Sequence, residues 1–237
     1  MLDQKQRKKL IDFLDKWLKS KINNVLKSLV DLKDLKEKNS SIKALAYQLY
    51  ENNGVLKRDQ VSEYLKDLDQ DQRKILRNLG VKFGRYHVFL HRLIKPEAVS
   101  LRTLLWKNYH QKYFNLKPPT FGLNFIDDKS KNKNFMLLCG FEKFDNLYLR
   151  IDILERLFVQ IINIKSEKDI KVMPEMLNLL GCSKDNFKKL LKSMNYKIIE
   201  KDKEVFFRYY PKKSFKKSNK KIEKESPFGV LKNLNFN

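Results

Sequence analysis

The chain of 237 residues holds only three histidines and two cysteines, and their spacing does not complete a metal site. His87 and His91 stand four positions apart and could share one helix face as metal ligands. No acidic or cysteine partner stands at metal-ligand spacing from them, and no HExxH motif is present. We therefore expect structural or nucleic-acid-facing roles for both histidines and predict no metal site.

An aspartate triplet resembles the start of a calcium-binding loop. Asp67, Asp69 and Asp71 have the alternating spacing of such loops. Gln72, however, stands where the loop needs glycine, and Asn78 stands where it needs glutamate. The sequence therefore predicts no calcium site.

The two cysteines, Cys139 and Cys182, are far apart and form no CxxC pair, which argues against a zinc ribbon and a disulfide framework. Cys182 precedes an expected helix, whose N-terminus can lower a thiol pKa, but no histidine stands near it in sequence, so we expect a packing role. Reduced thiols and the lack of a signal-peptide pattern favour a cytoplasmic location.

Motifs of nucleotide-driven or hydrolytic chemistry are missing from the sequence. It contains no GxxxxGK[ST], no GxSxG and no GxGxxG. We therefore predict no catalytic residues and no cofactor within this chain. No apolar run approaches the roughly 20 residues that a membrane span needs, so we expect no membrane partner.

Charge is the strongest signal in the composition. Lys and Arg number 51 against 28 Asp and Glu, a formal net charge of +23. Self-repulsion disfavours a compact state of such charge, and a polyanionic partner relieves it. The alternative is a codon bias toward Lys, Asn and Ile. We favour nucleic acid as the partner, either RNA or single-stranded DNA.

A lysine stripe gives this charge a location. Lys184, Lys188 and Lys192 are four positions apart, so they share one face of a predicted helix over 184–194. The alternative is an ordinary solvated helix face. The predicted nucleic-acid contacts in the helix and the following hairpin are Lys184, Lys188, Lys189, Lys192, Lys201, Lys203 and Arg208. Those in the basic tail are Lys212, Lys213, Lys216 and Lys217.

The last third of the chain has the clearest element order. The pattern predicts helices over 151–163, 174–180 and 184–194, a brief extended piece at 171–172, and a hairpin with strands at 196–200 and 205–210. Gly181 is expected to stop the second helix and Ser183 to cap the third. Helix, short strand, two helices and hairpin is the order of a winged helix.

The rest of the chain is expected to be helical. Apolar residues at three- and four-residue steps predict a helix over 3–37. Its apolar face over 10–29, with Trp17, is interpreted as core packing, and a docking face is the alternative. Further helices are predicted over 42–52, 58–68, 71–79 and 96–113, with a short strand or turn within 81–95.

The predicted fold class is mainly α, with an N-terminal helical domain and a C-terminal winged-helix-like domain that carries a small β-hairpin. The predicted domains are a helical domain at 1–114, a linker at 115–134, a winged-helix-like domain at 135–210 and a basic tail at 211–237.

Four stretches carry a family resemblance, at 76–106, 140–157, 173–196 and 226–234. Together they resemble the C-terminal region of the long alphaproteobacterial superfamily 2 helicases related to the mitochondrial degradosome RNA helicase. The first stretch, with the pairs Gly80-Val81, Phe83-Gly84 and Lys95-Pro96, is the most specific. His91 stands where the family usually has proline.

The resemblance implies an accessory region that handles substrate for an ATP-dependent RNA helicase. In that family two upstream RecA-like domains bind ATP, and this chain holds none of their motifs. It further implies a helicase ATPase core on another chain as a partner. Two alternatives stay open: a protein-interaction module that docks onto a helicase core, and a winged-helix DNA-binding regulator. The regulator ranks low because the basic residues are mostly Lys rather than base-reading Arg.

Overall fold

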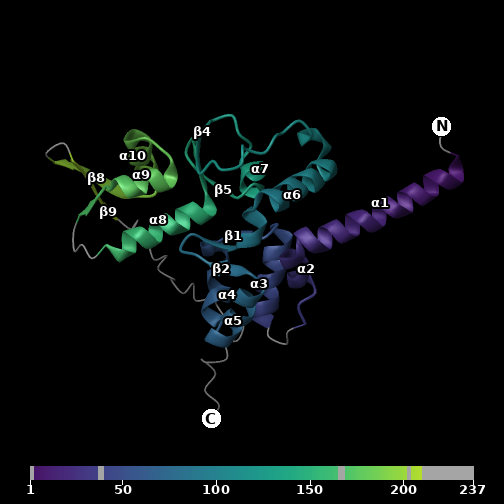
Figure 1. Ribbon diagram of the computed structural model, residues 1–237. Helices are drawn as coiled ribbons and strands as arrows, with labels where there is room; N and C mark the ends of the chain where they lie inside the picture. Colours follow the sequence, from purple (N-terminus) through teal and green to yellow (C-terminus); the bar gives the residue numbers. More distant parts are fainter. Residues whose placement is uncertain (1–2, 37–39, 165–168, 202–203, 210–237) are drawn as a thin grey trace, which may run out of the picture.

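The computed structural model describes residues 3–36, 40–164, 169–201 and 204–209. Over these residues the protein is mainly helical, with three small antiparallel sheets of three strands each (Figure 1). The mainly α class expected from the sequence is therefore confirmed. We name three parts by their sheets: the N-terminal module (residues 27–94), the central module (96–150) and the C-terminal module (151–209, as far as described).

The first helix, α1 (Gln4–Val25), extends as an arm from the body of the molecule (Figure 1). Asp3 caps it by accepting a hydrogen bond from the Gln6 amide at 2.7 Å. No residue of α1 is buried. The interpretation of its apolar face as core packing is therefore wrong for the outer part of the arm, where Trp17 is 55% exposed.

The expected single helix over 3–37 is interrupted at Leu26, and α2 (Lys27–Lys33) follows it. The cause is tertiary packing, because Leu26, Leu29 and Leu32 are all buried in the core of the N-terminal module. A straight continuation of α1 would carry these side chains away from that core.

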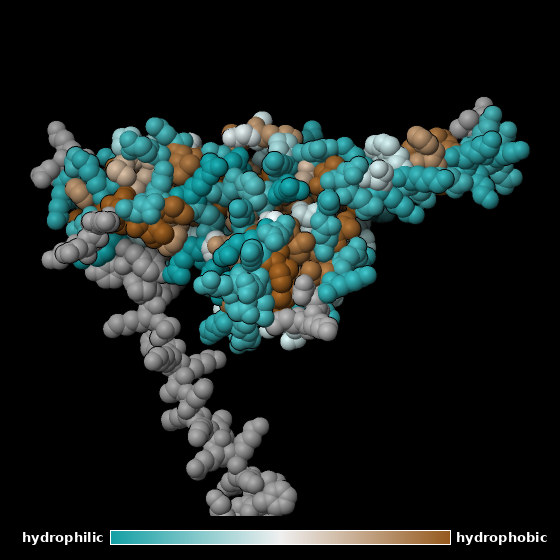
Figure 2. Space-filling model, turned by 60° about the horizontal axis from the view of Figure 1, so that its bottom comes forward, coloured by the Kyte–Doolittle hydropathy of each residue, from teal (hydrophilic) through white to brown (hydrophobic). Residues whose placement is uncertain are grey.

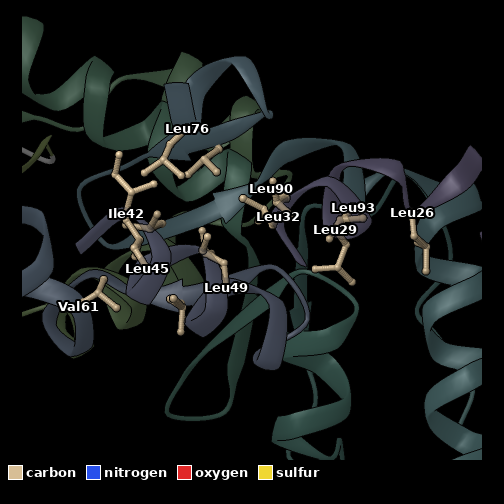
Figure 3. Close-up of a cluster of buried hydrophobic side chains, with 14 of the residues drawn as sticks. Leu26, Leu29, Leu32, Ile42, Leu45, Leu49, Val61, Leu76, Leu90 and Leu93 are labelled. Atoms are coloured by element: carbon tan, nitrogen blue, oxygen red, sulfur yellow. The ribbon is translucent and has the colours of Figure 1, made fainter. Parts of the chain in front are cut away.

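The N-terminal module places its helices around the first sheet. Its remaining elements are α3 (Ser40–Glu51), β1 (Val55–Lys57), a 3-10 turn (Arg58–Val61), α4 (Ser62–Asp67), α5 (Gln70–Asn78), β2 (Val81–Phe83), β3 (His87–Leu90) and a second 3-10 turn (His91–Ile94). Figure 3 shows leucines from α2, α3, α5 and β3 meeting in one core. The ambiguous stretch 81–95 is thus a hairpin that leads into a helical turn.

The central module follows with α6 (Pro96–Tyr109), a 3-10 turn (Gln111–Tyr113), β4 (Phe125–Asp127), α7 (Lys133–Leu138), β5 (Phe141–Phe144) and β6 (Leu147–Arg150). β4 lies inside the segment expected as a linker at 115–134, and it pairs antiparallel with β6. Leu116, in the same segment, packs against the core around Phe135 and Tyr148.

A buried arginine joins the central module to the N-terminal module. Arg102 of α6 donates hydrogen bonds to the carbonyls of Asn53, Leu93 and Leu138. Its side chain is buried, and this desolvation lowers the pKa of Arg102 to about 10. The guanidinium therefore satisfies three carbonyl groups from three different segments.

The C-terminal module has the element order predicted from the sequence. It contains α8 (Ile151–Asn163), β7 (Ile170–Lys171), α9 (Pro174–Leu180), α10 (Lys184–Ser193), β8 (Tyr196–Lys201) and β9 (Glu204–Tyr209). Gly181 ends α9 in the left-handed region at φ 67°, and the Ser183 side chain accepts a hydrogen bond from the Asn186 amide, so both predicted caps are confirmed. The basic tail at 211–237 lies outside the described residues.

The three sheets share one topology. Their strand orders are β1-β3-β2, β4-β6-β5 and β7-β9-β8. In each, the last strand of the chain order lies in the middle and pairs antiparallel with both neighbours. The modules therefore repeat a pattern of helix, strand, one or more helices and hairpin, which the sequence pattern did not reveal.

Candidate nucleic-acid interface

Helix α10 presents the predicted lysine stripe. Its other face buries Phe187, Leu190 and Leu191 against the third sheet, so the opposite side is left to solvent. Lys184, Lys189 and Lys192 are exposed there, while the Lys188 side chain is 24% exposed. The helical spacing seen in the sequence therefore does produce a basic face.

Two carboxylates lie among these lysines: Asp185 on α10, whose Oδ1 is 3.9 Å from the Lys188 ammonium, and Glu200 on the neighbouring strand. Glu200 of β8 holds the Lys188 ammonium at 2.7 Å. This hydrogen bond lowers the pKa of Glu200, and the charges of Lys184 and Lys192 lower it further. The same hydrogen bond raises the pKa of Lys188. Lys188 is thus engaged within the protein, and Lys184 and Lys192 flank the pair.

The hairpin separates the other predicted contacts from this face. Tyr196, Ile198 and Glu200 point toward α10, because side chains alternate along a strand and Tyr196 packs in the core against Phe207. Lys201 and the pair Lys197–Arg208 therefore lie on the opposite face of the sheet. Those members of the predicted helix and hairpin set that the structure describes therefore do not form one continuous surface.

Arg208 has a partner of its own. Its guanidinium contacts Asp169 Oδ1 from Nε at 2.9 Å and from Nη2 at 2.7 Å. A phosphate would have to exchange with this carboxylate. Five other predicted contacts lie outside the described residues: Lys203, Lys212, Lys213, Lys216 and Lys217.

A second basic surface was missed by the sequence reasoning. A groove of about 1090 Å³ runs between the β2–β3 hairpin and α8. Its basic lining residues are Arg58, Lys82, Arg85, His91 and Arg156, and its apolar ones include Phe83, Phe158, Val159 and Ile162. These residues are distant in sequence, so no local spacing could indicate that they share a groove.

The turn of the β2–β3 hairpin is fixed to α8 by a carboxylate. Glu155 accepts hydrogen bonds from the backbone amides of Arg85, Tyr86 and His87, at 2.5, 2.9 and 2.9 Å. At Gly84, a Cβ would stand 2.5 Å from both oxygens of Glu155. The absence of a side chain at Gly84 is therefore what lets the carboxylate approach.

His87 extends this joint into the central module. Its Nε2 lies 2.9 Å from Glu142 Oε2, and its Nδ1 lies 3.6 Å from Glu155 Oε1. Lys57 approaches the other Glu142 oxygen at 2.7 Å. A buried imidazole thus connects carboxylates from two modules, and a cleft of about 350 Å³ borders this group beside the end of α10.

Opposing effects set the ionisation of this cluster. Burial disfavours the imidazolium, but the hydrogen bond with Glu142 and the charges of Glu142 and Glu155 raise the pKa of His87 overall. Burial likewise opposes ionisation of Glu142, but His87 and Lys57 lower the pKa of Glu142 overall. The charged pair is therefore the favoured state at mildly acidic pH.

The other candidate residues, the histidine pair and the aspartate triplet, do not come together as the sequence spacing would allow. His87 lies on a strand and is buried, whereas His91 lines the groove, so the two do not share a helix face. Asp69 caps α5 by accepting a hydrogen bond from the Gln72 amide at 2.8 Å. Within the described ranges, no three His, Cys, Asp or Glu residues are grouped so that they could hold a metal ion.

Neither thiol is activated. Burial raises the pKa of Cys139 to about 12 and that of Cys182 to about 11. The possibility that a helix N-terminus lowers the pKa of Cys182 is therefore not realised. Both cysteines are free, and a packing role fits both.

The fold and surfaces define a mainly helical protein with basic faces and small antiparallel sheets. None of its described helices is both long and apolar enough to cross a lipid bilayer. Comparison with protein families, characterised proteins and solved structures finds no match to this chain. The resemblance to superfamily 2 helicases therefore rests on the sequence stretches alone.

Proposed function

We propose that this chain is a nucleic-acid-binding accessory region, with RNA favoured, of a superfamily 2 helicase whose ATPase core is supplied by another chain. The observation that carries the proposal is the basic face of α10, where Lys184, Lys188 and Lys192 lie around the Glu200 carboxylate. Lysines that project from a helix can contact phosphates in a fixed geometry, and α10 is held in place by its buried apolar face.

The C-terminal module is proposed to act as a winged helix. Its support is the order α8, β7, α9, α10, β8, β9 and the strand order β7-β9-β8. In this interpretation α10 is the recognition helix and the β8–β9 turn is the wing. The formal charge of +23 supports a polyanionic partner independently of that assignment.

Charge reversal on α10 tests the proposal. Lys184→Glu combined with Lys192→Glu is expected to weaken binding of a single-stranded RNA about tenfold or more, because two phosphate contacts become repulsive. The slope of log affinity against log salt should fall by about 0.7 per lost contact. Lys188 is left unchanged because it pairs with Glu200. Fluorescence anisotropy across a salt series measures both quantities.

The matched control is Lys66→Glu with Lys129→Glu, which changes the net charge equally at exposed sites of the other two modules. An equal loss of affinity in both double variants would mean that the change in net charge alone weakens binding. That result would contradict a specific contact between α10 and the RNA.

A second candidate function is docking onto a helicase core, and α1 favours it. Leu10, Phe13, Leu14 and Trp17 are 46%, 64%, 48% and 55% exposed on one arm (Figure 2). An exposed apolar stripe on a projecting helix is typical of a protein-binding surface.

Polar substitution of the arm tests this docking role. Phe13→Ser with Trp17→Ser is expected to weaken binding to a separately purified ATPase core of the resembled helicase family about 700-fold or more, since two buried aromatic anchors each contribute about 2 kcal/mol or more and every 1.4 kcal/mol is tenfold in affinity. Calorimetry in nuclease-treated solution measures the affinity. Tyr47→Ser, at a 61% exposed position on α3, is the control. No detectable binding by the unmodified chain would rule the docking role out.

A further inference from the structure

We propose that the groove between the β2–β3 hairpin and α8 binds a single-stranded segment of nucleic acid, a site separate from the α10 face. The proposal rests on the nucleic-acid-binding function proposed above. It adds where the nucleic acid binds and specifies that the bound segment is single-stranded. The groove, of about 1090 Å³, lies at the upper end of the roughly 300–1,000 Å³ of typical small-molecule pockets, so it has room for a short segment of a polymer.

The groove is basic because its acidic residues are already compensated. Glu155 accepts three backbone amides and approaches His87. Asp152 holds Arg150 through both oxygens, at 2.7 and 3.1 Å. Lys82, Arg85 and Arg156 are exposed at the groove, and Arg58 is held at its edge by donating to the Gly84 carbonyl. The net field therefore attracts an anion.

The floor of the groove is apolar and partly aromatic. Val159 and Ile162 are 50% and 57% exposed on α8, beside the half-buried Phe158 ring. Figure 2 shows hydrophobic surface gathered over this helix, and hydrophilic surface on the side of the N-terminal module that faces it. Arg85 lies 5.7 Å from the centre of the Phe158 ring. Bases stack on aromatic rings and on arginine planes, so this pair is a suitable base platform.

A basic rim over an apolar floor favours a single strand over a duplex. In a duplex the base faces are covered, and the outer surface is sugar and phosphate, which would leave the apolar floor unmatched. In a single strand the bases are free to contact the apolar floor, while phosphates contact the basic side chains of Lys82, Arg85 and Arg156 at the groove edge.

The test uses the full chain, fluorescein-labelled U20 RNA and a labelled 20-base-pair RNA duplex. Lys82→Glu with Arg156→Glu is expected to weaken U20 binding about tenfold and to lower the salt slope by about 1.4, that is 0.7 for each of two contacts. Duplex binding should change less than threefold. Lys82→Gln with Arg156→Gln provides a second variant if the reversed charges disturb folding, and it should show a smaller loss in the same direction.

Crosslinking gives an independent location. U20 that contains 4-thiouridine should crosslink to Phe158 or to residues 82–85, as identified by mass spectrometry. Crosslinks confined to α10, or U20 affinity of the groove variants equal to that of the Lys66→Glu and Lys129→Glu control, would overturn the groove site while leaving the proposed function standing.

Two further outcomes distinguish failure of the groove site from failure of the proposed nucleic-acid-binding function. If the unmodified chain binds neither RNA, the proposed function itself fails. If a labelled peptide of alternating Asp and Leu binds in a manner sensitive to Lys82→Glu and Arg156→Glu, while U20 does not, the groove is a peptide site and the inference is overturned.

Discussion

Gly84→Ala is expected to lower the free energy of unfolding by about 3 kcal/mol or more, a large effect for the addition of one methyl group. The new Cβ would lie 2.5 Å from both oxygens of Glu155, so the carboxylate must leave its site. Three amides, those of Arg85, Tyr86 and His87, then lose their acceptor. The Tyr86 and His87 amides lie in part-buried surroundings, where each unpaired donor costs about 1–3 kcal/mol, whereas the exposed Arg85 amide can bond to water. Urea denaturation followed by circular dichroism measures the change.

A double-mutant cycle identifies the cause. Once Glu155→Ala has removed the carboxylate, Gly84→Ala should add little further destabilisation, because the clash no longer exists. The two single effects should therefore be strongly non-additive. Additive effects would mean that Gly84 is required for a reason other than the approach of Glu155, and would contradict this account of the hairpin joint.

Glu142→Gln is expected to destabilise the protein by about 3–5 kcal/mol, the usual cost of breaking a buried ion pair from one side. The substitution leaves the Lys57 ammonium and the buried His87 without their shared carboxylate. Asp145→Asn, at an exposed position in the neighbouring turn, removes the same charge where it has no buried partner and should have an effect below about 0.5 kcal/mol.

The buried ion pair of His87 and Glu142 predicts a pH dependence of stability with a definite sign. The pKa of His87 is raised above 6.5 in the folded protein, so its contribution is fully present below pH 6.5 and is lost as pH rises through the raised value. The pKa of Glu142 is lowered below 4.5, so its contribution is present above pH 4.5 and is lost as pH falls through the lowered value. The facing groups are Lys57 and Glu155. This joint is therefore strongest between about pH 4.5 and 6.5.

Urea denaturation at pH 5.5, 7.0 and 8.5 tests this sign. The unmodified chain should lose stability toward pH 8.5, and Glu142→Gln should flatten that decline because the main cause of the raised pKa of His87 is gone. An identical decline in both proteins would show that His87 does not titrate through this contact.

The sequence predicted those elements whose ends are marked by local chemistry. Gly181 and Ser183 define the boundary between α9 and α10, and the strand-like stretches on either side of residues 201–204 predicted the last hairpin. The break at Leu26 could not be predicted, since the apolar periodicity continues through it and only the position of the core decides where the helix turns. β4 was missed because three residues carry little pattern and their partner β6 lies more than twenty residues onward.

The candidate interface was predictable to a similar extent. Spacing of four residues predicted the basic face of α10, because helix geometry is local. The pairing of Lys188 with Glu200 depends on how the third sheet packs on α10, and the charge balance of that face was therefore not predictable. The groove is even harder to predict from the sequence, since Arg58, Lys82 and Arg156 come together only when two modules dock. The division into domains at 114 and 134 stays a prediction.

The common strand order of the three sheets has a consequence for how the chain acquires its structure during synthesis. The middle strand is always the last to leave the ribosome, so no sheet can assemble until β3, β6 or β9 has emerged. The N-terminal module can thus close once Leu90 is available, the central one at Arg150 and the C-terminal one at Tyr209. Since domains generally fold as units in the order of translation, this arrangement divides folding into three successive steps and limits the length of unpaired chain exposed at any moment.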